Sequence, residues 1–311
     1  MTHVYGVVPS RRLGRSLGVS TIPFKTCNYS CIYCQLGRTT NMTNTRTSFY
    51  PPGEIINQVR DFVNEKGDES FDVVTVVGEG EPTLYRPLDQ LAEAIRKLTF
   101  KPLVLITNGS LLFDEDLRDE ISGFDIVMPT LDAYDQESFR CINRPLGRLE
   151  YEEVYEGLVD FSRKFDGELW LEVMLVKGYN DDEESLMLLK ERISRVKTER
   201  VYINVPARPP AEDGVKIPDI ATLKLARELL GATSIENLPV SNFLSRESDA
   251  ESTVIEIIKR HPMSQEDIES LLRSRFGPGS AEVFFEKLSS RGDVERCEYV
   301  GKIFYRYRSI L

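Results

Sequence analysis

Short apolar runs alternate with longer amphipathic stretches over the first 230 residues of the chain. The apolar runs have the length and the β-branched composition of buried strands, and the longer stretches repeat apolar residues every three or four positions, as helices do. Strands are predicted at 17–21, 72–77, 102–107, 125–129, 168–176 and 200–204. Helices are predicted at 54–65, 87–98, 114–121, as a pair within 135–165, and at 181–195 and 219–230. This alternation predicts six βα units and an α/β fold with parallel strands.

Six parallel strands with outer helices form either an open doubly wound sheet or a partial barrel, and both place functional loops at the carboxyl ends of the strands. Residues 78–82, Gly-Glu-Gly-Glu-Pro, follow the second predicted strand, and residues 107–109, Thr-Asn-Gly, end the third. Such segments also occur in ordinary turns, so by themselves they do not separate a binding loop from a simple turn.

The chain changes character after residue 240. Residues 241–252 are polar and are predicted to link a domain at 1–240 to a second domain at 253–311. Ser264 is placed to cap a helix whose first turn contains carboxylates. In this second domain, helices are predicted at 253–259, after Ser264 and at 281–290, and strands at 294–299 and 302–307. Three helices followed by a hairpin predict a winged helix.

Composition and charge narrow the class of protein. The 311 residues, 41% hydrophobic and 29% charged, suit a globular protein with either one large and one small domain or two medium ones, and length alone does not choose. No leader sequence and no run of about 20 apolar residues is found, so we predict a cytoplasmic protein without membrane contact. A net charge of −11 argues against a general nucleic-acid or membrane-surface binder. Residues 251–311 contain ten basic and ten acidic residues, so the negative charge lies in the first domain.

Three of the five cysteines, Cys27, Cys31 and Cys34, have the spacing C-x₃-C-x₂-C just after the first predicted strand. In a reducing compartment this grouping indicates a metal or redox site rather than a disulfide framework. Three thiolates can bind three irons of a [4Fe–4S] cubane and leave the fourth iron without a protein ligand, which is the interpretation that we favour. Two alternatives stay open: a zinc site, which needs a fourth ligand, and a redox dithiol at Cys31 and Cys34, which leaves Cys27 unexplained.

Three other residues are singled out by their surroundings. Cys141 and Cys297 stand alone, and each is interpreted as a small buried apolar residue, with a thiol hydrogen donor as the alternative for Cys141. Glu172 lies among apolar neighbours in the fifth predicted strand. Because an unpaired buried carboxylate is costly, Glu172 should face a cofactor inside the barrel or form an ion pair with a neighbouring strand.

Several arginines lie near predicted strand ends. Guanidinium groups bind phosphate or carboxylate in bidentate fashion, and they also form ordinary surface salt bridges, so two interpretations are open. They apply to Arg11, Arg12, Arg15 and Arg38 around the first strand and the cysteines, and to Arg140, Arg144 and Arg208.

The cysteine spacing, with Tyr33 just before the third cysteine, resembles the C-x₃-C-x-aromatic-C signature of the radical S-adenosylmethionine (SAM) superfamily. Residues 78–82 are similar to the family's Gly-Gly-Glu-Pro motif, although the family has Gly in the place of Glu79. Residues 107–109 resemble its turn after the third strand, and residues 130–132, Thr-Leu-Asp, a Ser-Leu-Asp segment. The resemblance covers most of residues 1–240 and implies a partial (β/α)₆ barrel. Its cysteine motif is specific, whereas each of the other segments is weak alone.

The resemblance implies two cofactors, a [4Fe–4S] cluster on Cys27, Cys31 and Cys34 and SAM on the open iron. It implies reductive cleavage of SAM to a 5′-deoxyadenosyl radical that modifies an unknown substrate, with an external one-electron donor of ferredoxin or flavodoxin type. No catalytic residue is assigned. The residues assigned to SAM binding are Tyr33, Gly78, Glu79, Gly80, Glu81, Pro82, Thr107, Asn108, Thr130, Asp132 and Glu172.

Residues 8–18, 34–37 and 142–145 resemble a poorly characterised prokaryotic branch of the superfamily that is distantly related to wyosine-forming tRNA enzymes. The Cys-Trp-Arg sequence and the additional N-terminal cysteines of the wyosine enzymes are absent, so the likeness does not extend to wyosine synthesis.

Substrate class stays open among RNA, a protein or peptide, and a metabolite. The third helix of the predicted winged helix carries two acids and two bases, unlike a helix that reads DNA, whereas the hairpin carries Lys302, Arg306 and Arg308. Contact of this domain with RNA or with a protein substrate is one expectation, and docking against the barrel is another. The alternative function is an iron–sulfur or SAM-sensing regulator that binds nucleic acid through the winged helix.

Overall fold

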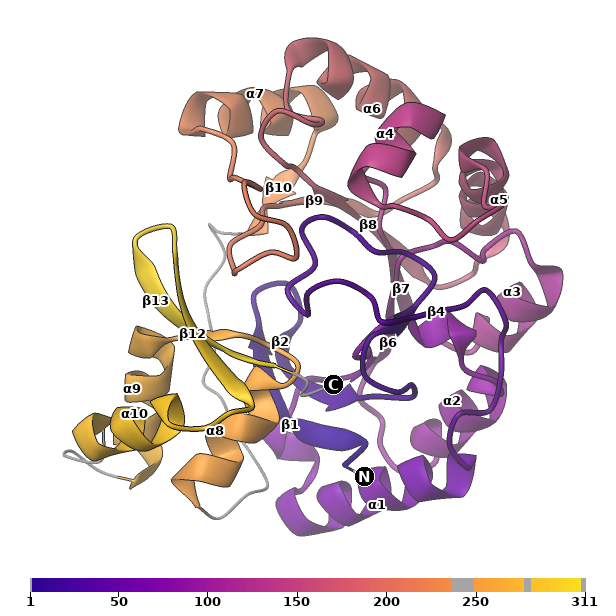
Figure 1. Cartoon of the computed structure of the whole chain (residues 1–311). Coiled ribbons are helices and arrows are strands. Elements are labelled where there is room, and N and C mark those ends of the chain that lie inside the picture. The colour runs from indigo at the N-terminus through magenta and orange to yellow at the C-terminus, as the bar shows by residue number, and fades with distance from the viewer. Residues whose placement is uncertain (1, 236–248, 277–280, 309–311) are drawn as a thin grey trace.

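The structure is a computed structural model that describes residues 2–235, 249–276 and 281–308. Its larger part is an eight-stranded sheet with the strand order β1-β2-β5-β6-β7-β8-β9-β10 (Figure 1). Neighbours are parallel from β2 to β10, and β1 pairs with β2 in antiparallel fashion. The strands are Val4–Ser10 (β1), Gly14–Val19 (β2), Val73–Val76 (β5), Leu103–Thr107 (β6), Ile126–Pro129 (β7), Glu168–Met174 (β8), Arg200–Asn204 (β9) and Thr233–Ser234 (β10).

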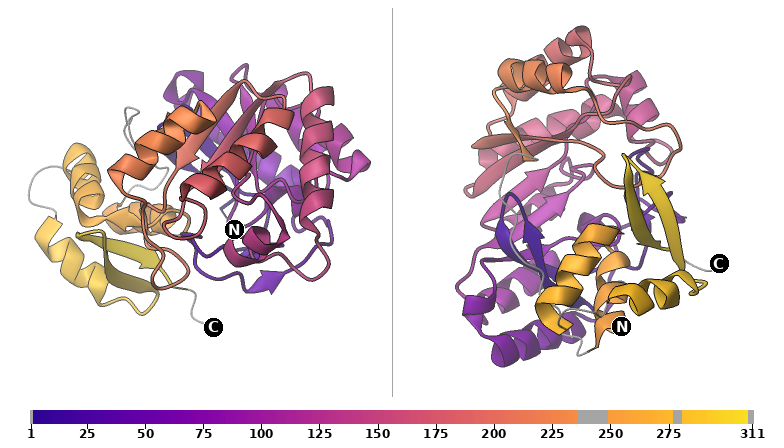
Figure 2. Two further views of the ribbon diagram at one scale, coloured as in Figure 1. Left: turned by 90° about the horizontal axis from the view of Figure 1, so that it is seen from above. Right: turned by 90° about the vertical axis from the view of Figure 1, so that its left-hand side faces the viewer.

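The helices between these strands lie on the outside of the curved sheet (Figures 1 and 2). They are α1 (Pro52–Lys66), α2 (Leu88–Arg96), α3 (Glu115–Ile121), α4 (Gln136–Ile142), α5 (Tyr151–Lys164), α6 (Glu183–Arg195) and α7 (Ile220–Leu230). This arrangement is a partial barrel and confirms the predicted α/β fold. Each predicted strand and helix of this part is present, with bounds that shift by at most three residues.

Strand β1 was not predicted. Gly6 and Pro9 interrupt its apolar run, and the pairing with β2 shifts register between Tyr5 and Val7, so that Gly6 forms a bulge. Pro9 is tolerated because β1 is the edge strand, where a missing N–H breaks no ladder on the open side.

Apolar side chains of the strands alternate between two cores. Val74 packs under the helices, whereas its neighbour Val73 belongs to a second cluster with Trp170 on the inner face of the sheet. Two members of this cluster mark its position along the strands: Leu13 stands just before β2, and Ile126 is the first residue of β7. This inner cluster therefore fills the amino-terminal end of the barrel, and the opposite end is left to the polar loops.

The C-terminal unit, residues 249–276 and 281–308, has its own hydrophobic core. Helices α8 (Ala250–Ile258), α9 (Gln265–Phe276) and α10 (Ala281–Ser289) accompany a three-stranded antiparallel sheet of order β11-β13-β12. Its strands are Met263–Ser264 (β11), Val294–Tyr299 (β12) and Lys302–Tyr307 (β13). The predicted helices and hairpin strands are confirmed, and their assignment to the winged-helix class stays a prediction.

Two helix starts in this unit follow from side-chain caps. The Ser264 hydroxyl accepts a hydrogen bond from the Asp267 amide at 3.1 Å, as the predicted cap of α9 requires. Asp249 caps α8 by accepting from the Ser252 amide at 2.9 Å, so this helix begins three residues before its predicted start. Residues 249–252 of the predicted linker thus belong to α8 and its cap, and residues 241–248 lie outside the described part of the chain.

Among the described residues, none of the helices combines the length and the apolar character needed to span a membrane.

Candidate cofactor site

The cysteine segment follows β2 and crosses the carboxyl end of the barrel, where the short strands β3 (Thr26–Cys27) and β4 (Asn41–Met42) pair in parallel (Figure 1). Cys27, Cys31 and Cys34 are all partly buried. Burial raises the pKa of all three thiols, and the neighbouring cysteines raise the pKa of Cys31 further. The three sulfur atoms therefore lie within electrostatic reach of one another.

Nitrogen donors point at these sulfur atoms. The Tyr29 amide donates to Cys27 Sγ at 3.4 Å, and the Asn108 side-chain amide reaches the same sulfur at 3.7 Å. Asn143 Nδ2 lies 3.6 Å from Cys31 Sγ. Amide groups that donate to a thiolate orient it and tune its affinity for a metal or cluster.

The donor set fits a cubane better than a single ion. In the part of the chain that the structure describes, no three His, Cys, Asp or Glu side chains converge closely enough to hold one metal ion. A [4Fe–4S] cubane does not need such convergence, because each thiolate binds a different iron. Three half-buried thiols with amide donors suit a negatively charged cluster, which is the group that the sequence predicts.

The turn at residues 78–82 packs directly on the cysteine segment. A Cβ on Gly80 would stand 1.7 Å from the Thr26 carbonyl oxygen, so this position requires glycine. The Glu81 amide donates to that same carbonyl at 3.0 Å, and the Glu79 carbonyl accepts from the Lys25 amide at 2.5 Å. The predicted SAM motif and the predicted cluster motif are therefore one packed unit.

The buried Glu81 carboxylate holds the next strand end in place. It accepts from the Thr83 amide at 2.9 Å, from Thr107 Oγ1 at 2.6 Å and from the Asn108 amide at 2.7 Å. Burial raises the pKa of Glu81 despite these donors. Protein groups engage both of its oxygens, so the carboxylate positions Thr107 and Asn108.

Asp132 lies at the centre of a second buried network. It accepts from the Tyr33 hydroxyl, from Asn143 Nδ2 at 2.9 Å and from the Met174 amide at 2.7 Å. Burial raises the pKa of Asp132 to about 6, although these three donors favour the carboxylate. Asn143 also contacts Cys31, so the network joins the cysteine segment to the ends of β7 and β8.

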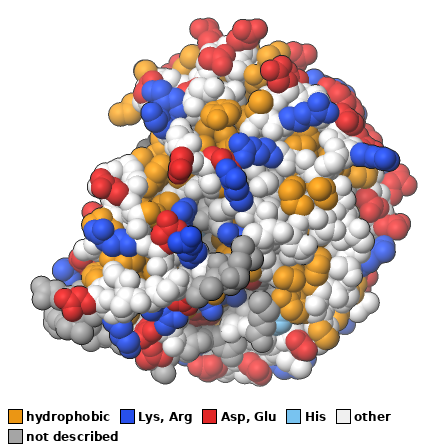
Figure 3. All heavy atoms as spheres, viewed as in Figure 1, with side chains coloured by type: hydrophobic (Ala, Val, Ile, Leu, Met, Phe, Trp, Pro, Cys, Tyr) orange, Lys and Arg blue, Asp and Glu red, His pale blue; other side chains and the backbone are white. Residues whose placement is uncertain are grey.

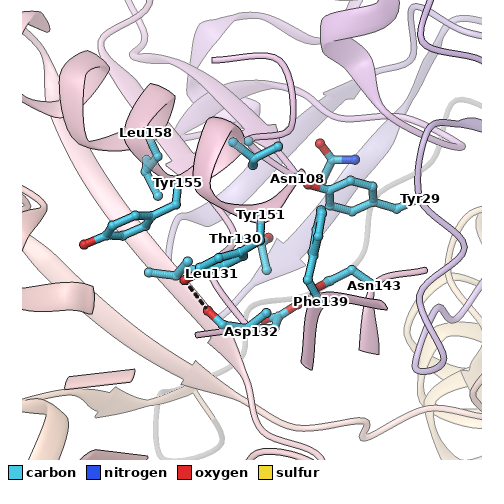
Figure 4. Close-up of a pocket in the computed structure, with 13 residues that line it drawn as sticks. Tyr29, Asn108, Thr130, Leu131, Asp132, Phe139, Asn143, Tyr151, Tyr155 and Leu158 are labelled. Carbon is cyan, nitrogen blue, oxygen red and sulfur yellow. Dashed lines mark hydrogen bonds between the residues drawn. The ribbon is translucent and has the colours of Figure 1, made fainter. Parts of the chain in front are cut away.

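A small cavity lies beside this network, between the cysteine segment, the end of β7 and helices α4 and α5 (Figure 4). Asn108, Thr130, Asp132 and Asn143 contribute polar groups to its wall. Aromatic rings complete it, among them Tyr29, Phe139, Tyr151 and Tyr155. Its volume of about 20 Å³ is room for about one water molecule, so the cavity is not itself large enough to hold SAM. Of the predicted SAM residues, the cavity brings together Asn108, Thr130 and Asp132; Tyr33 adjoins it through Asp132.

Glu172 forms an ion pair, the second of its two predicted interpretations. Its partner is Arg12, in the turn between β1 and β2, and its other oxygen accepts from Asn204 Nδ2 at 3.2 Å. The partner was predicted on a neighbouring strand, and that detail is wrong because Arg12 reaches across the inner face of the open barrel.

The arginines are mostly salt-bridged. Arg15 pairs with Asp72 at 2.7 Å, and Arg38 and Arg144 share the Glu212 carboxylate, each at 2.7 Å. Arg140 lies 3.9 Å from Glu150, and Arg208 donates a hydrogen bond to the Pro262 carbonyl. Arg11 is exposed. The hairpin cations behave similarly, since Lys302 pairs with Glu266 at 2.6 Å and Arg306 with Glu295 at 3.0 Å.

The interpretation of Cys141 as a buried residue is wrong, because its side chain is exposed. Helix α4 turns Phe139 and Ile142 toward the core, which directs the two residues between them, Arg140 and Cys141, outward. Cys297, on β12, is partly buried.

Sequence reasoning missed Asn143 and Asn28. Asn143 belongs to residues 142–145, which contributed to the family resemblance, but no role was predicted for it. Asn28 donates to Ser110 Oγ at 2.7 Å and accepts from Asn108 Nδ2 at 2.9 Å, which ties the cysteine segment to the turn after β6. A polar residue that directly follows a predicted ligand was the available signal.

The chain was compared with known proteins. The family model of the radical SAM superfamily matches residues 21–189. A UPF0026 protein of Methanocaldococcus jannaschii is 36% identical, over 98% of this chain and 96% of that protein. A UPF0026 protein of Synechocystis sp. is 36% identical, over 66% of this chain and 76% of that protein.

Among solved structures, TYW1 with a lysine–pyruvate adduct bound has a TM-score of 0.51 at 19% identity, covering 75% of this chain and 80% of that one. A radical SAM methyltransferase from Sphaerobacter thermophilus also has a TM-score of 0.51, at 17% identity, covering 71% and 65%. These two likenesses show the shared fold. The family match over more than half of the chain establishes that this protein belongs to the radical SAM superfamily, whose cofactors are a [4Fe–4S] cluster and SAM, and the relatives at 36% identity establish that it belongs to the UPF0026 group of proteins.

Proposed function

We propose that this protein is an enzyme that holds a [4Fe–4S] cluster on Cys27, Cys31 and Cys34, binds SAM beside it, and uses reductive cleavage of SAM to modify a substrate. The observation that carries the proposal is the packing of the cysteine segment against the turn at 78–82, with nitrogen donors aimed at the sulfur atoms. When bound, the reduced cluster supplies one electron that cleaves SAM to methionine and a 5′-deoxyadenosyl radical.

The chain's own residues bind and orient the cofactors. Glu81 fixes Thr107 and Asn108, and Asp132 fixes Tyr33 and Asn143, so that polar groups from the ends of β5, β6 and β7 meet at one edge of the cysteine segment. The aromatic rings of Tyr29 and Phe139 pack behind Asp132 and support this edge from the side of α4.

An external one-electron donor of ferredoxin or flavodoxin type is part of the proposal, and the substrate is an RNA, a protein or peptide, or a metabolite. Of the three hairpin cations, Lys302 and Arg306 pair with glutamates and Arg308 is exposed. Because residues 251–311 also carry as many acidic as basic residues, a peptide or protein is favoured over RNA. Figure 3 shows acidic side chains along the upper and right-hand rim of the face seen in Figure 1, with Lys and Arg side chains nearer to its middle.

The test is anaerobic reconstitution with iron and sulfide, followed by SAM and dithionite, which replaces the natural donor. We expect cluster absorption and the release of 5′-deoxyadenosine and methionine. A variant with Cys27, Cys31 and Cys34 changed to Ala should lose both, whereas Cys141→Ala, which changes an exposed cysteine, should keep both. A folded wild-type protein that gains no cluster, or that leaves SAM intact, would contradict the proposal.

A further inference from the structure

Helix α8 of the C-terminal unit lies against β1 of the barrel (Figure 1). Arg260 follows this helix, one residue after its cap Lys259. Its guanidinium stands over the ring of Tyr5, with 4.5 Å from the central carbon to the ring centre. It donates to the carbonyl of Thr2 at 2.8 Å and to that of Glu256 at 3.2 Å. The side chain is 10% exposed. Contacts on several sides therefore fix the position of this cation.

The same guanidinium faces the predicted SAM motif. Arg260 Nε lies 3.5 Å from Oε1 of Glu79, whose side chain is 6% exposed. The other carboxylate oxygen of Glu79 accepts from Ser20 Oγ at 3.2 Å. A carboxylate buried to this degree needs a compensating charge, and Arg260 supplies one from a distant part of the chain.

The residues around Arg260 also contact the cysteine segment. Gln35, which follows Cys34, donates from Nε2 to the Arg260 carbonyl at 3.2 Å and lies 3.5 Å from His261 Nδ1. Arg208, in the loop after β9, donates to the Pro262 carbonyl at 3.0 Å. Residues 260–262 thus contact the turn at 78–82, the cysteine segment and the loop after β9.

We propose that Arg260 is a positioning residue for SAM and that the C-terminal unit forms part of the cofactor site. This inference rests on the proposed function. The resemblance places glycine where this chain has Glu79, so the turn at 78–82 carries an additional buried charge. Arg260 neutralises that charge and holds the turn against the cysteine segment, because the Glu79 carbonyl and the Gly80 backbone pack on Lys25 and Thr26.

The first test measures SAM binding to the reconstituted full-length protein together with its iron and sulfide content. Arg260→Ala should weaken SAM affinity by about tenfold or more, because a buried carboxylate loses its partner, while the iron content stays at the wild-type level. Arg260→Lys should weaken SAM affinity less than Arg260→Ala does, since lysine keeps the positive charge. The matched control is Lys259→Ala. The ammonium group of Lys259 stands over the Tyr307 ring, so this variant should bind SAM as the wild type does.

A double-mutant cycle separates the ion pair from general disruption. If Glu79 acts through Arg260, the variant Glu79→Gln with Arg260→Ala should bind SAM more tightly than Arg260→Ala alone, because the unpaired charge is gone. Wild-type affinity in Arg260→Ala, or independent effects of the two substitutions, would overturn the proposal.

A third measurement needs no cofactor. Hydrogen exchange of the apoprotein should be faster in Arg260→Ala than in the wild type for peptides that contain residues 78–82, and unchanged for peptides of α3. Unchanged exchange at 78–82 contradicts the role of Arg260 in any case. If the wild type fails to bind SAM while this exchange difference is present, the proposed function fails and the positioning of the turn by Arg260 stands.

Discussion

Single residues at the site are constrained by backbone packing more than by charge. Gly80 shows this clearly, because its missing side chain lets the Thr26 carbonyl approach the turn at 78–82. The carbonyl belongs to the residue before Cys27 and accepts a hydrogen bond from the Glu81 amide, so neither strand end can move independently. The identity of one glycine thus links the predicted cluster ligand Cys27 to the predicted SAM motif.

We expect Gly80→Ala to destabilise the protein by about 2–4 kcal/mol and to prevent full cluster loading, since a backbone atom cannot yield as a flexible side chain would. Thermal unfolding and iron content measure the two effects. Gly53→Ala in α1 is the matched control: its new Cβ meets open space, and the stability should change little or rise. Equal unfolding temperatures of Gly80→Ala and the wild type would refute this packing argument.

Individual elements are joined by a few buried polar contacts, and Glu120 of α3 provides one of them. Its carboxylate accepts from Arg46 at 2.6 and 3.0 Å and from the Leu88 amide at 3.1 Å. Arg46 also donates to the Thr83 carbonyl at 2.9 Å, so the loop after the cysteine segment is tied to α3 and to the short helix η2 (Pro82–Leu84). Burial alone would raise the pKa of Glu120, but these donors outweigh it and lower the pKa below its ordinary value of 4.5.

Because the folded state holds the charged form of Glu120, its contribution to stability is present above pH 4.5 and is lost as the pH falls below that value. Glu120→Gln should therefore lower the free energy of unfolding by about 1–3 kcal/mol at pH 7, and by less at pH 3.5. Urea unfolding at the two pH values measures this difference. Asp119→Asn, at the exposed neighbouring position, serves as control and should change little at either pH. A deficit for Glu120→Gln that is the same at both pH values would exclude this linkage.

The sequence predicted the local elements well and the contacts between distant residues poorly. The strands of the barrel were recognisable because each faces two apolar cores, and the three cysteines were recognisable as a group because their spacing is short, while their role as ligands stays a prediction. Asn143 and Cys31 are 112 positions apart, and no local pattern marks such a pair. Glu79 was identified through its motif, but its partner Arg260 lies 181 positions further along the chain, in the C-terminal unit. Cys141 was wrongly predicted to be buried, because Phe139 and Ile142 determine which face of the short helix α4 packs on the core.

At the scale of the whole molecule, the C-terminal unit is joined to the barrel by polar and aromatic contacts. Tyr299 donates its hydroxyl to the Pro206 carbonyl at 2.7 Å, and the rings of Phe24 and Tyr307 meet edge to face with centres 5.8 Å apart. Together with the contacts of residues 260–262, these interactions connect two hydrophobic cores that have no core residue in common.

We expect the wild-type protein to unfold in a single calorimetric transition, because this contact couples the two cores. Phe24→Ala should broaden or split the transition and cost about 1–2 kcal/mol, since it removes the ring contact with Tyr307. Phe100→Ala is the control, because that ring is 100% exposed, and its transition should match the wild type. Two separate transitions in the wild type would show that the units unfold independently.

The hydrogen bond from Arg260 to the Thr2 carbonyl joins residues 258 positions apart. During synthesis, the N-terminal strand and the turn that contains Glu79 leave the ribosome long before Arg260 is made. A nascent chain that has finished its barrel strands still lacks the cation for a carboxylate that the finished protein buries. The turn at 78–82 therefore acquires its buried counter-charge only after translation has passed α8, whereas the three cysteines are already in place long before.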